Sequence, residues 1–420
     1  METLPPVPCT LSYFGKNRIE QIWYNCWTCS QKPSMGVCYA CAHICHKGHQ
    51  LGNQDQELGL NNYNRGKFFC DCANGAFDVK CQCLQVVKPS TSVIELADTQ
   101  VDYQIVKSAY SFSPCSIVSP MNLKMALELG GAVFDCNDVV MPFIKSKYTE
   151  VPSPYLFVGC GVFGAKSANT QGISFDCMVT EKSGKQIINE FVDTMTRGMI
   201  PDLLTQEPIG ITVVSTLYFK GEWAEPFDEH QTSENYEFDG LNGTTKIPVM
   251  RKFGNKKNTK FMVTKNLKSL ILPYVGDRFV AILTLPRIGS LHDMLSDPPK
   301  IFYDQWKEHL QMTDVMTLKI RHFVPKFSKR FKYDNMGQIL EKAGFDYVAF
   351  KNKSKIDDII HEVVIEMDEK GTRGSAATGL VSRGMSETDD EWIGDRPYMM
   401  AIVDTLNKSI LFAGVMDFTC

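Results

Sequence analysis

The sequence predicts a small cysteine-rich module at the N-terminus, followed by a large α+β domain built around a big β-sheet. Ten of the 15 cysteines lie before Leu84, and the other five are scattered. After Lys88 the chain changes to long segments with strand or helix periodicity. At 420 residues the chain is long for one domain and suits a small module joined to one large domain.

Cysteine and histidine residues in the first 81 positions are spaced like metal ligands. Pairs such as Cys26-Trp-Thr-Cys29 bring two ligands to one ion, and zinc takes four such ligands in a tetrahedron. Three separate zinc sites would need about twelve ligands, whereas eleven suffice if one thiolate bridges two ions. The candidate ligands are Cys9, Cys26, Cys29, Cys38, Cys41, Cys45, His46, His49, Cys70, Cys72 and Cys81.

A disulfide framework is the alternative interpretation of these cysteines. Disulfides have no use for His, so a Cys and His mixture in close pairs favours metal. The first residues have neither a basic start nor an apolar run, which argues against a secretory signal. Both observations fit a reducing compartment, and we expect the cytosol or the nucleus. Ligation energy also explains how a module with few aliphatic side chains can fold.

Bulk composition argues against two classes of function. The net charge of −4 gives no electrostatic case for binding nucleic acid. No run of about eighteen apolar residues is present, so we expect no transmembrane helix. We place the zinc module at 1–84, a linker at 85–92 and the large domain at 93–420, where the composition changes.

The order of the ligands in the module resembles the UBR box, the zinc domain of N-recognins. Two elements make the resemblance specific: Phe69-Cys-Asp-Cys72, and the Cys directly before His46-Lys-Gly-His49. The resemblance implies one site from Cys26, Cys29, His46 and His49. It also implies a two-zinc cluster from the remaining candidates, bridged by Cys41. Cys45 would complete this cluster, with Cys83 as the alternative last ligand.

UBR boxes that bind basic N-termini hold them with acidic groups, and the resemblance places Asp71, next to Phe69, at one such position. Two other positions depart from the family pattern, with Lys32 and Asn74 where the family has Asp. A Lys there should repel a basic N-terminal residue. The module therefore either binds a peptide N-terminus of another kind or serves as a docking domain for a protein partner.

Local patterns predict the elements of the large domain in order. Apolar residues over 187–195 recur at helical spacing, and 210–219 is a β-branched run typical of a strand buried on both faces. Strand patterns at 269–275 and 279–285 flank Gly276-Asp277, which indicates a hairpin. We further expect alternating strand pattern over 318–327, a helix over 335–343, and strands over 361–367 and 409–414.

Small residues dominate the stretch 369–379, which comes after a strand pattern and precedes a long loop. In an extended chain alternate residues share a face. One face of this stretch is small enough to slide into a packed sheet, while Arg373 points the other way. A plain flexible linker needs no such segregation. The residues of the small face are Thr372, Gly374, Ala376 and Thr378.

This stretch resembles the hinge of a serpin reactive-centre loop, with hinge residues Glu369 and Gly371 at its start. Other serpin-like elements occur in order over 93–420. Phe112-Ser-Pro-Cys-Ser-Ile117 resembles the start of helix B, 188–204 resembles helix F and the segment after it, and 218–227 resembles the exit of strand 3A. The resemblance assigns shutter and breach roles to Ser113, Ser116, Ser215, His361 and Trp223.

The chain also departs from the serpin pattern. Ser215 stands where the family usually has Asn. The region 137–155 is too short for a full helix D, and 170–185 is trimmed before helix F. Such trimming resembles intracellular, virus-type serpins.

The resemblance implies a serpin fold with a mobile reactive-centre loop at about 369–396, and a suicide inhibitor rather than an enzyme. A protease attacks the loop, and the cut loop inserts between strands 3A and 5A before the acyl-enzyme is hydrolysed. Counting sixteen positions from Glu369 places the cleaved bond at Met385–Ser386, with Arg383 as the alternative. Met suits proteases of the elastase or chymotrypsin type. A non-inhibitory scaffold with the serpin fold is the alternative function.

Overall fold

Two units make up the chain in the computed structural model: Met1–Thr91 with Val151–Leu156, and Ser92–Glu150 with Phe157–Cys420. The structure describes residues 19–38, 41–42, 45–52, 64–72, 76–77, 99–145, 153, 155–165, 170, 172–175, 177–253, 260–296, 300–312, 315–317, 320–372 and 390–420.

The first unit is built on one small antiparallel sheet. β1 (Ile19–Cys26) pairs with β2 (Val37–Cys38), β3 (Leu51–Gly52) and β4 (Asn64–Phe68). Cysteines end both β1 and β2, and both are fully buried although the unit offers little aliphatic core. The sheet therefore delivers thiols into the interior of the unit, where a larger domain would place aliphatic side chains.

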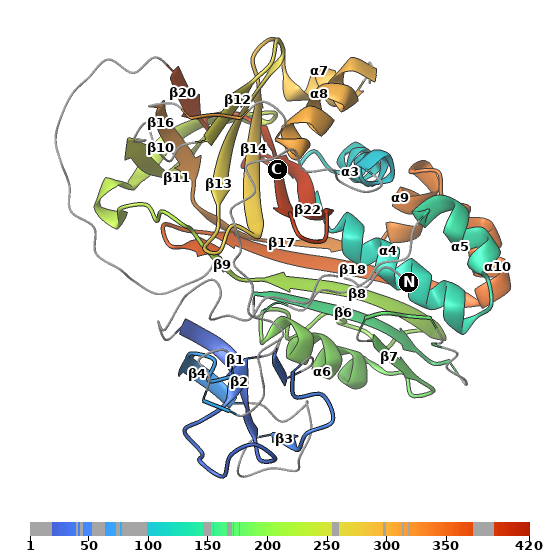
Figure 1. The fold of residues 1–420 in the computed structure, drawn as a ribbon. Coiled ribbons are helices and arrows are strands. Elements are labelled where there is room, and N and C mark those ends of the chain that lie inside the picture. Colours follow the sequence, from blue (N-terminus) through green and yellow to red (C-terminus); the bar gives the residue numbers. More distant parts are fainter. Residues whose placement is uncertain are drawn as a thin grey trace. The chain divides into compact units, whose positions relative to one another are not determined.

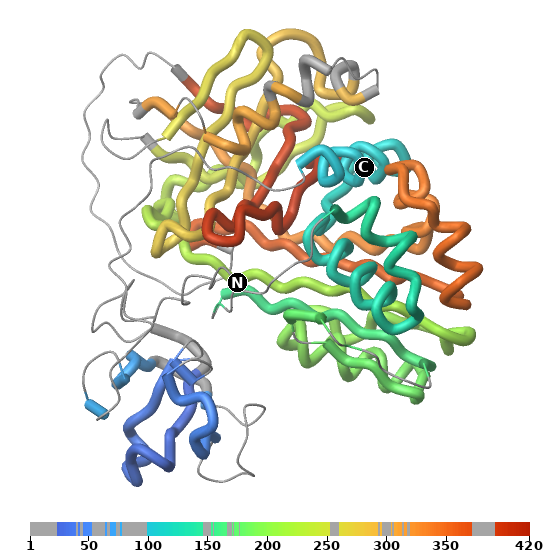
Figure 2. Tube along the Cα trace, turned by 45° about the vertical axis from the view of Figure 1, so that its right-hand side comes forward, coloured from blue at the N-terminus to red at the C-terminus, as the bar shows by residue number. Residues whose placement is uncertain are grey.

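The second unit contains a five-stranded sheet, called sheet A here, which runs through its centre (Figure 1). Its strands, in spatial order, are β17 (Phe327–Tyr333), β18 (Ile356–Met367), β8 (Ile211–Phe219), β6 (Leu156–Phe163) and β7 (Cys177–Thr180). β18 and β8 are parallel neighbours although they are far apart in sequence, and both figures show the orange β18 beside the yellow-green β8 (Figures 1 and 2).

Two further sheets belong to the same unit. Sheet B has seven strands in the order β15 (Met316–Thr317), β12 (Lys260–Val263), β13 (Leu267–Pro273), β14 (Phe279–Pro286), β21 (Tyr398–Asp404), β22 (Ser409–Met416) and β5 (Ser116–Val118). Sheet C has the order β10 (Ser233–Gly240), β11 (Gly243–Phe253), β16 (Ile320–Pro325) and β20 (Asp390–Ile393). A separate two-residue pair joins β19 (Gly371–Thr372) to β9 (Gly221–Glu222).

Helices cover both faces of sheet A. The helices of this unit are α3 (Thr99–Phe112), α4 (Pro120–Val133), α5 (Asn137–Ile144), α6 (Lys185–Thr196), α7 (Leu291–Ser296), α8 (Lys300–Gln311), α9 (Met336–Lys342) and α10 (Tyr347–Ser354), with a 3-10 turn η1 (Glu229–Gln231). Of these, α4 and α6 contact β8 of sheet A, whereas α8 contacts β13 of sheet B. Apolar side chains of α6 pack with Val214 of β8 and Ile360 of β18. On the opposite face, Cys160 of β6 donates to Asn122 of α4. Among the described residues, no helix is long and apolar enough to span a membrane.

The elements expected from local periodicity are present. The helical spacing at 187–195 is α6, the β-branched run is β8, and all but its first residue is buried. The expected hairpin joins β13 and β14, and Gly276 and Asp277 in its connection both have positive φ, a conformation that Gly and Asp adopt more readily than other residues. The helix expected over 335–343 is α9.

One expected element begins later than the resemblance indicated. The motif 112–117 was assigned to the start of a helix, but it spans the last residue of α3 and the first part of β5. The helix α4 begins at Pro120, because Ser119 accepts a capping bond from the Asn122 N–H and Pro suits the first helical position. The described residues between α5 and β6 contain no further helix.

Candidate functional site

The seam between β8 and β18 is the first candidate site. The two strands pair directly from Ile211↔Ile356 to Leu217↔Val363, with no strand between them. β17 continues to pair with β18 beyond that point, up to Phe327↔Met367. The β8–β18 ladder therefore ends before β18 does. We call the end of the seam near Met367 its upper end and the end near Ile356 its lower end. Within the described part of sheet A, β8 and β18 form no ladder pairs with each other at the upper end.

A hydrogen-bonded histidine spans the middle of this seam. His361 of β18 is fully buried, and its Nε2 accepts from the Ser119 N–H at 3.1 Å. Burial lowers the pKa of His361 to about 3, so the ring is neutral at physiological pH. A neutral ring with Nε2 as acceptor carries its proton on Nδ1. Nδ1 therefore donates to Ser215 Oγ on β8, 3.1 Å away, across the seam.

Two of the expected shutter residues do not take part in this contact. Ser113 Oγ donates to the Cys115 carbonyl at 2.9 Å, within its own turn. Ser116 is buried, and its Oγ has no hydrogen-bond partner among the described residues. The structure thus brings Ser215 and His361 together and adds Ser119, whose backbone role the sequence pattern did not single out.

The hinge leaves the upper end of β18 through a tight turn. The N–H of Asp368 donates to the Gly371 carbonyl at 2.9 Å, and β19 then runs antiparallel to β9, with Gly371 opposite Glu222 and Thr372 opposite Gly221. Gly371 has φ +146°, and a Cβ there would lie 2.1 Å from the Gly221 carbonyl oxygen. Only glycine allows the two backbones to lie this close together. The close contact between Gly371 and Gly221 therefore sets the path of the chain where it leaves β18.

Glu369 is held by two side chains that the sequence pattern did not identify. Its carboxylate accepts from Thr232 Oγ1 at 2.6 Å and pairs with Lys326 Nζ at 3.0 Å. The pKa of Glu369 is lowered, because the bonds from Thr232 and Lys326 outweigh its burial, the largest single contribution. Lys326 lies at the end of the alternating pattern expected over 318–327, which predicts a strand but not this partner.

Trp223 anchors the same region. Its ring stacks on Tyr274 with centroids 4.5 Å apart, and its Nε1 donates to the Asp368 carbonyl at 2.9 Å. The Trp223 N–H also donates to the Lys370 carbonyl. The expected residues of the reactive centre and of the distal hinge lie outside the described residues: Gly374, Ala376, Thr378, Arg383, Met385 and Ser386.

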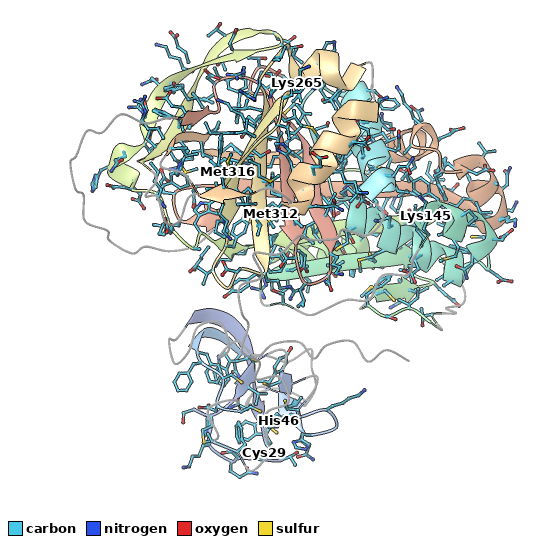
Figure 3. All side chains as sticks on the ribbon, turned by 45° about the horizontal axis from the view of Figure 1, so that its top comes forward. Cys29, His46, Lys145, Lys265, Met312 and Met316 are labelled. Atoms are coloured by element: carbon cyan, nitrogen blue, oxygen red, sulfur yellow. The ribbon has the colours of Figure 1, made fainter. Side chains whose placement is uncertain are left out.

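The second candidate site lies in the first unit, where Cys26, Cys29, His46 and His49 converge. Figure 3 labels two of them, Cys29 and His46. Their ligand atoms all lie within 4.8 Å of one another. Individual sulfur-to-Nδ1 distances are 3.4 Å for Cys26–His49, 3.4 Å for Cys29–His46 and 3.2 Å for Cys29–His49. A tetrahedral zinc ion with normal bond lengths separates sulfur and nitrogen ligands by roughly 3.5 Å. The donor set fits zinc.

Two further groups of thiols share one member. Cys38, Cys41 and Cys70 form one group, and Cys41, Cys45 and Cys72 form the other. Hydrogen bonds from the four surrounding thiols, and then burial, raise the pKa of Cys41 far above its usual range. A bound cation reverses this effect, because a coordinating thiol is deprotonated. Such packing of thiols suits a metal cluster. Cys9, Cys81 and Cys83 lie outside the described residues.

Asp71 lies between two of these cysteines in sequence and is tied to the residue before β2. One carboxylate oxygen accepts from the Gly36 N–H at 2.9 Å, and Asp71 is only 8% exposed. Phe69 is half-buried, and its ring stacks at 6.3 Å on Phe68, which in turn stacks on Trp23 at 4.4 Å.

Two family models match the chain. Residues 165–417, more than half of the chain, match the family described as serpin (serine protease inhibitor). The chain belongs to the serpin family. Residues 8–85 match the zinc finger in N-recognin, the UBR box. Sheet A with its seam and hinge therefore belongs to a serpin domain, and the Cys and His clusters belong to a UBR-type zinc module.

Individual relatives are distant. Mouse (Mus musculus) macrophage plasminogen activator inhibitor 2 is 26% identical over 59% of this chain and 64% of its own length. A serpin-like protein of Methanosarcina mazei is 26% identical over 64% of this chain and 64% of its own length. The chain thus spans less than two thirds of these relatives. The native structure of the thermophilic serpin Tengpin shares the fold, with a TM-score of 0.58 and 16% identity over 76% of this chain and 92% of that one.

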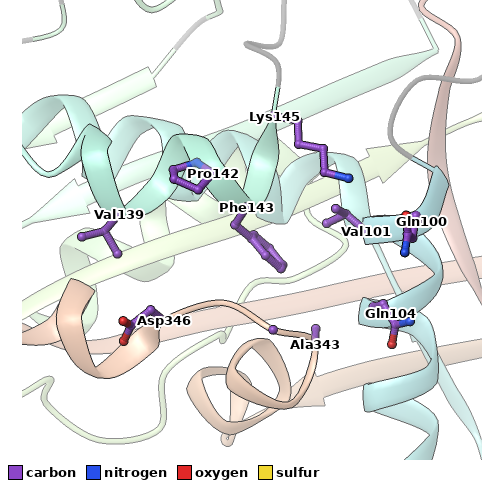
Figure 4. A pocket seen from close by; sticks show the side chains of 10 residues that line it. Gln100, Val101, Gln104, Val139, Pro142, Phe143, Lys145, Ala343 and Asp346 are labelled. Atoms are coloured by element: carbon purple, nitrogen blue, oxygen red, sulfur yellow. The ribbon is translucent and has the colours of Figure 1, made fainter.

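A cavity of about 300 Å³ lies elsewhere in the serpin domain, between α3, α5 and the turn before α10 (Figure 4). Phe143 points into it, and Gln104, Lys145 and Asp346 stand at its sides. It shares no lining residue with the seam, the hinge or the thiol groups.

Proposed function

We propose that this serpin domain is a suicide inhibitor of a serine or cysteine protease and that the zinc module binds a peptide or protein partner. The direct pairing of β8 with β18, beside a hinge anchored at the upper end of their seam, carries the proposal. If β8 and β18 separate, sheet A can accept one more strand between them. The two edges that become exposed offer backbone N–H and C=O groups to that strand. Strand addition of this kind is a recognised mode of binding.

Chain length and register support insertion. The segment from Thr372 to Met385 has 14 residues, and β18 has 12, so the cut loop can run along the whole strand. Extending the β19–β9 register places residue 378 opposite Ser215. Its side chain would then lie on the same face as the Ser215–His361 bond, together with the other members of the small face. The seam centre would receive Thr378, a small polar side chain.

The proposed cleavage site is Met385–Ser386, with Arg383 as the alternative. We expect one protease in a panel of elastase, chymotrypsin and trypsin types to form a complex that survives SDS. Mass spectrometry of the released C-terminal fragment identifies the bond: a first residue Ser386 supports Met385, whereas Gly384 points to Arg383. Cleavage by every protease without a stable complex would contradict the inhibitory function and favour the scaffold alternative.

For the zinc module, we propose three zinc ions held by eleven ligands. The four-membered Cys and His group supplies one site, and the two thiol groups that share Cys41 supply parts of two more. Cys9 and Cys81 would complete these two sites. The place of Cys45, close to Cys41 and Cys72, supports it over Cys83 as a ligand.

We also propose that Phe69 and Asp71 border the site for a peptide N-terminus. Lys32 is exposed, so its charge is available to repel a basic first residue. Peptides that start with Leu, Gly or Met should therefore bind the full-length protein more tightly than a peptide that starts with Arg. Isothermal titration of the wild type and of Asp71→Asn measures this. Tighter binding of the Arg peptide would contradict the role of Lys32, and unchanged binding by Asp71→Asn would contradict the location.

A further inference from the structure

Any strand that enters between β8 and β18 must break the bonds that cross their seam, because neighbouring strands lie about 4.8 Å apart. The backbone ladder and the Ser215–His361 bond cross it near the middle. Other bonds cross it on the face covered by α6. At the lower end, the Ile211 N–H donates to the Asp357 carboxylate at 2.9 Å. Higher up, a bond from Arg330 joins β17 to the segment between α6 and β8.

Arg330 contacts two parts of the sheet with one guanidinium. Its Nε pairs with the carboxylate of Glu362 on β18. One terminal NH₂ donates to the Asp202 carbonyl, 2.8 Å away, in the segment 197–210 that connects α6 to β8. The Arg330 side chain is 41% exposed, whereas the Glu362 side chain is fully buried. The arginine therefore fastens the connecting segment to the β18 side of the seam.

The connecting segment is bound to α6, on the β8 side. Asn189 of α6 bonds both backbone groups of Leu204, at 3.0 and 2.8 Å. Glu207 accepts from the Lys185 N–H at 2.9 Å, at the first turn of the helix. α6 packs in turn on Val214 of β8 and also on Ile360 of β18, but the segment itself continues directly into β8 at Ile211. When β8 separates from β18, this segment goes with β8 and the Arg330–Asp202 bond must break.

Glu362 keeps Arg330 in place. It is the register partner of Thr216 on β8, so the two side chains share the α6 face at the seam. Within the described part of the chain, Glu362 Oε2 and Thr216 Oγ1 are buried without a hydrogen-bond partner. A buried carboxylate with only part of its hydrogen bonding satisfied depends strongly on its one cation. Arg330 therefore stays on Glu362 and is held where it reaches Asp202.

We infer that Arg330 is a latch across the seam and that its bond to Asp202 slows the opening of sheet A. This inference rests on the proposed inhibitory function and names a positioning residue for it. Because the latch is broken once a strand is inserted, it stabilises the closed sheet and contributes nothing to the inserted form. Its loss should speed insertion without changing the inserted product.

The variant Arg330→Lys separates the two contacts of Arg330. A lysine ammonium can still pair with Glu362, but it cannot also reach Asp202, because it lacks the forked guanidinium. We expect the full-length variant to take up an acetylated peptide of the sequence 372–385 about fivefold faster than the wild type, the size of one lost hydrogen bond. Native gel electrophoresis and the rise in melting temperature monitor the uptake. Arg321→Lys is the matched control, since Arg321 pairs with Glu391 in sheet C.

Each result has one meaning. Faster uptake by Arg330→Lys, wild-type uptake by Arg321→Lys and equal melting temperatures of the peptide-bound forms support the latch. If the wild type takes up the peptide and Arg330→Lys does so at the wild-type rate, the latch is wrong and the proposed function stands. If the wild type neither takes up the peptide nor gains stability on loop cleavage, the proposed function fails and the latch fails with it.

Discussion

Replacing Thr372 with Arg should turn this serpin from a trap into a substrate of its target protease. Thr372 is opposite Gly221 in the β19–β9 pair, and the extended register puts the inserted side chain on the face of sheet A that carries Ser215 and His361. At Gly221 that face is covered by the Tyr274 ring, so an arginine there would bury a charge without a partner. Such burial costs several kcal/mol, enough to stall insertion at its first step.

Two measurements check this expectation. The variant should be cleaved at the wild-type bond but form little SDS-resistant complex, and its cleaved form should not gain the melting temperature that the cleaved wild type gains. Thr372→Val is the control, because it keeps the size of the side chain and introduces no charge, so it should still trap the protease. Full trapping by Thr372→Arg would show that this residue does not enter the sheet.

Under the proposed three-zinc assignment, replacing Cys41 with Ser should remove two of the three ions at once. Its sulfur belongs to both three-membered thiol groups, and a serine hydroxyl is a poor substitute for a bridging thiolate. Ligation energy supplies most of the folding energy of such a module, so loss of two ions should unfold it. Native mass spectrometry of the full-length protein should count three zinc ions in the wild type and one or none in the variant.

Cys29→Ser is the matched control for this experiment. Cys29 belongs only to the group with Cys26, His46 and His49, so this variant should lose one ion and keep two. Equal losses in the two variants would contradict a thiolate shared between two ions. Two zinc ions in the wild type would contradict the eleven-ligand assignment.

Local patterns predicted the elements of this serpin well, whereas contacts between distant segments could not be read from them. The helical period of α6 and the turn residues Gly276 and Asp277 are set by neighbours in sequence. The partners of Glu369 are different, since Thr232 and Lys326 come from separate elements that only the folded sheets bring together. Thr232 follows η1 and Lys326 lies between β16 and β17, and neither position indicates in the sequence which carboxylate the side chain will contact.

The difference between local patterns and distant contacts also explains which site residues could be predicted. The metal groups were predicted because zinc requires close pairs of ligands, which are visible as spacing. Ser113 was expected beside His361, yet its hydroxyl is taken by the nearby Cys115 carbonyl, a local competitor. Arg330 was not singled out, because its role depends on a backbone carbonyl of the segment before β8, which no side-chain pattern records.

Neither Gly371 nor Gly221 has room for a side chain where the hinge begins. A Cβ on Gly371 would meet the Gly221 carbonyl oxygen at 2.1 Å, and a Cβ on Gly221 would meet the Tyr274 ring at 2.4 Å. The backbone from which the loop departs therefore requires glycine at both positions. Under the proposed function, the residues around Met385 can change to suit other proteases, provided that the length of the loop and its small face are kept.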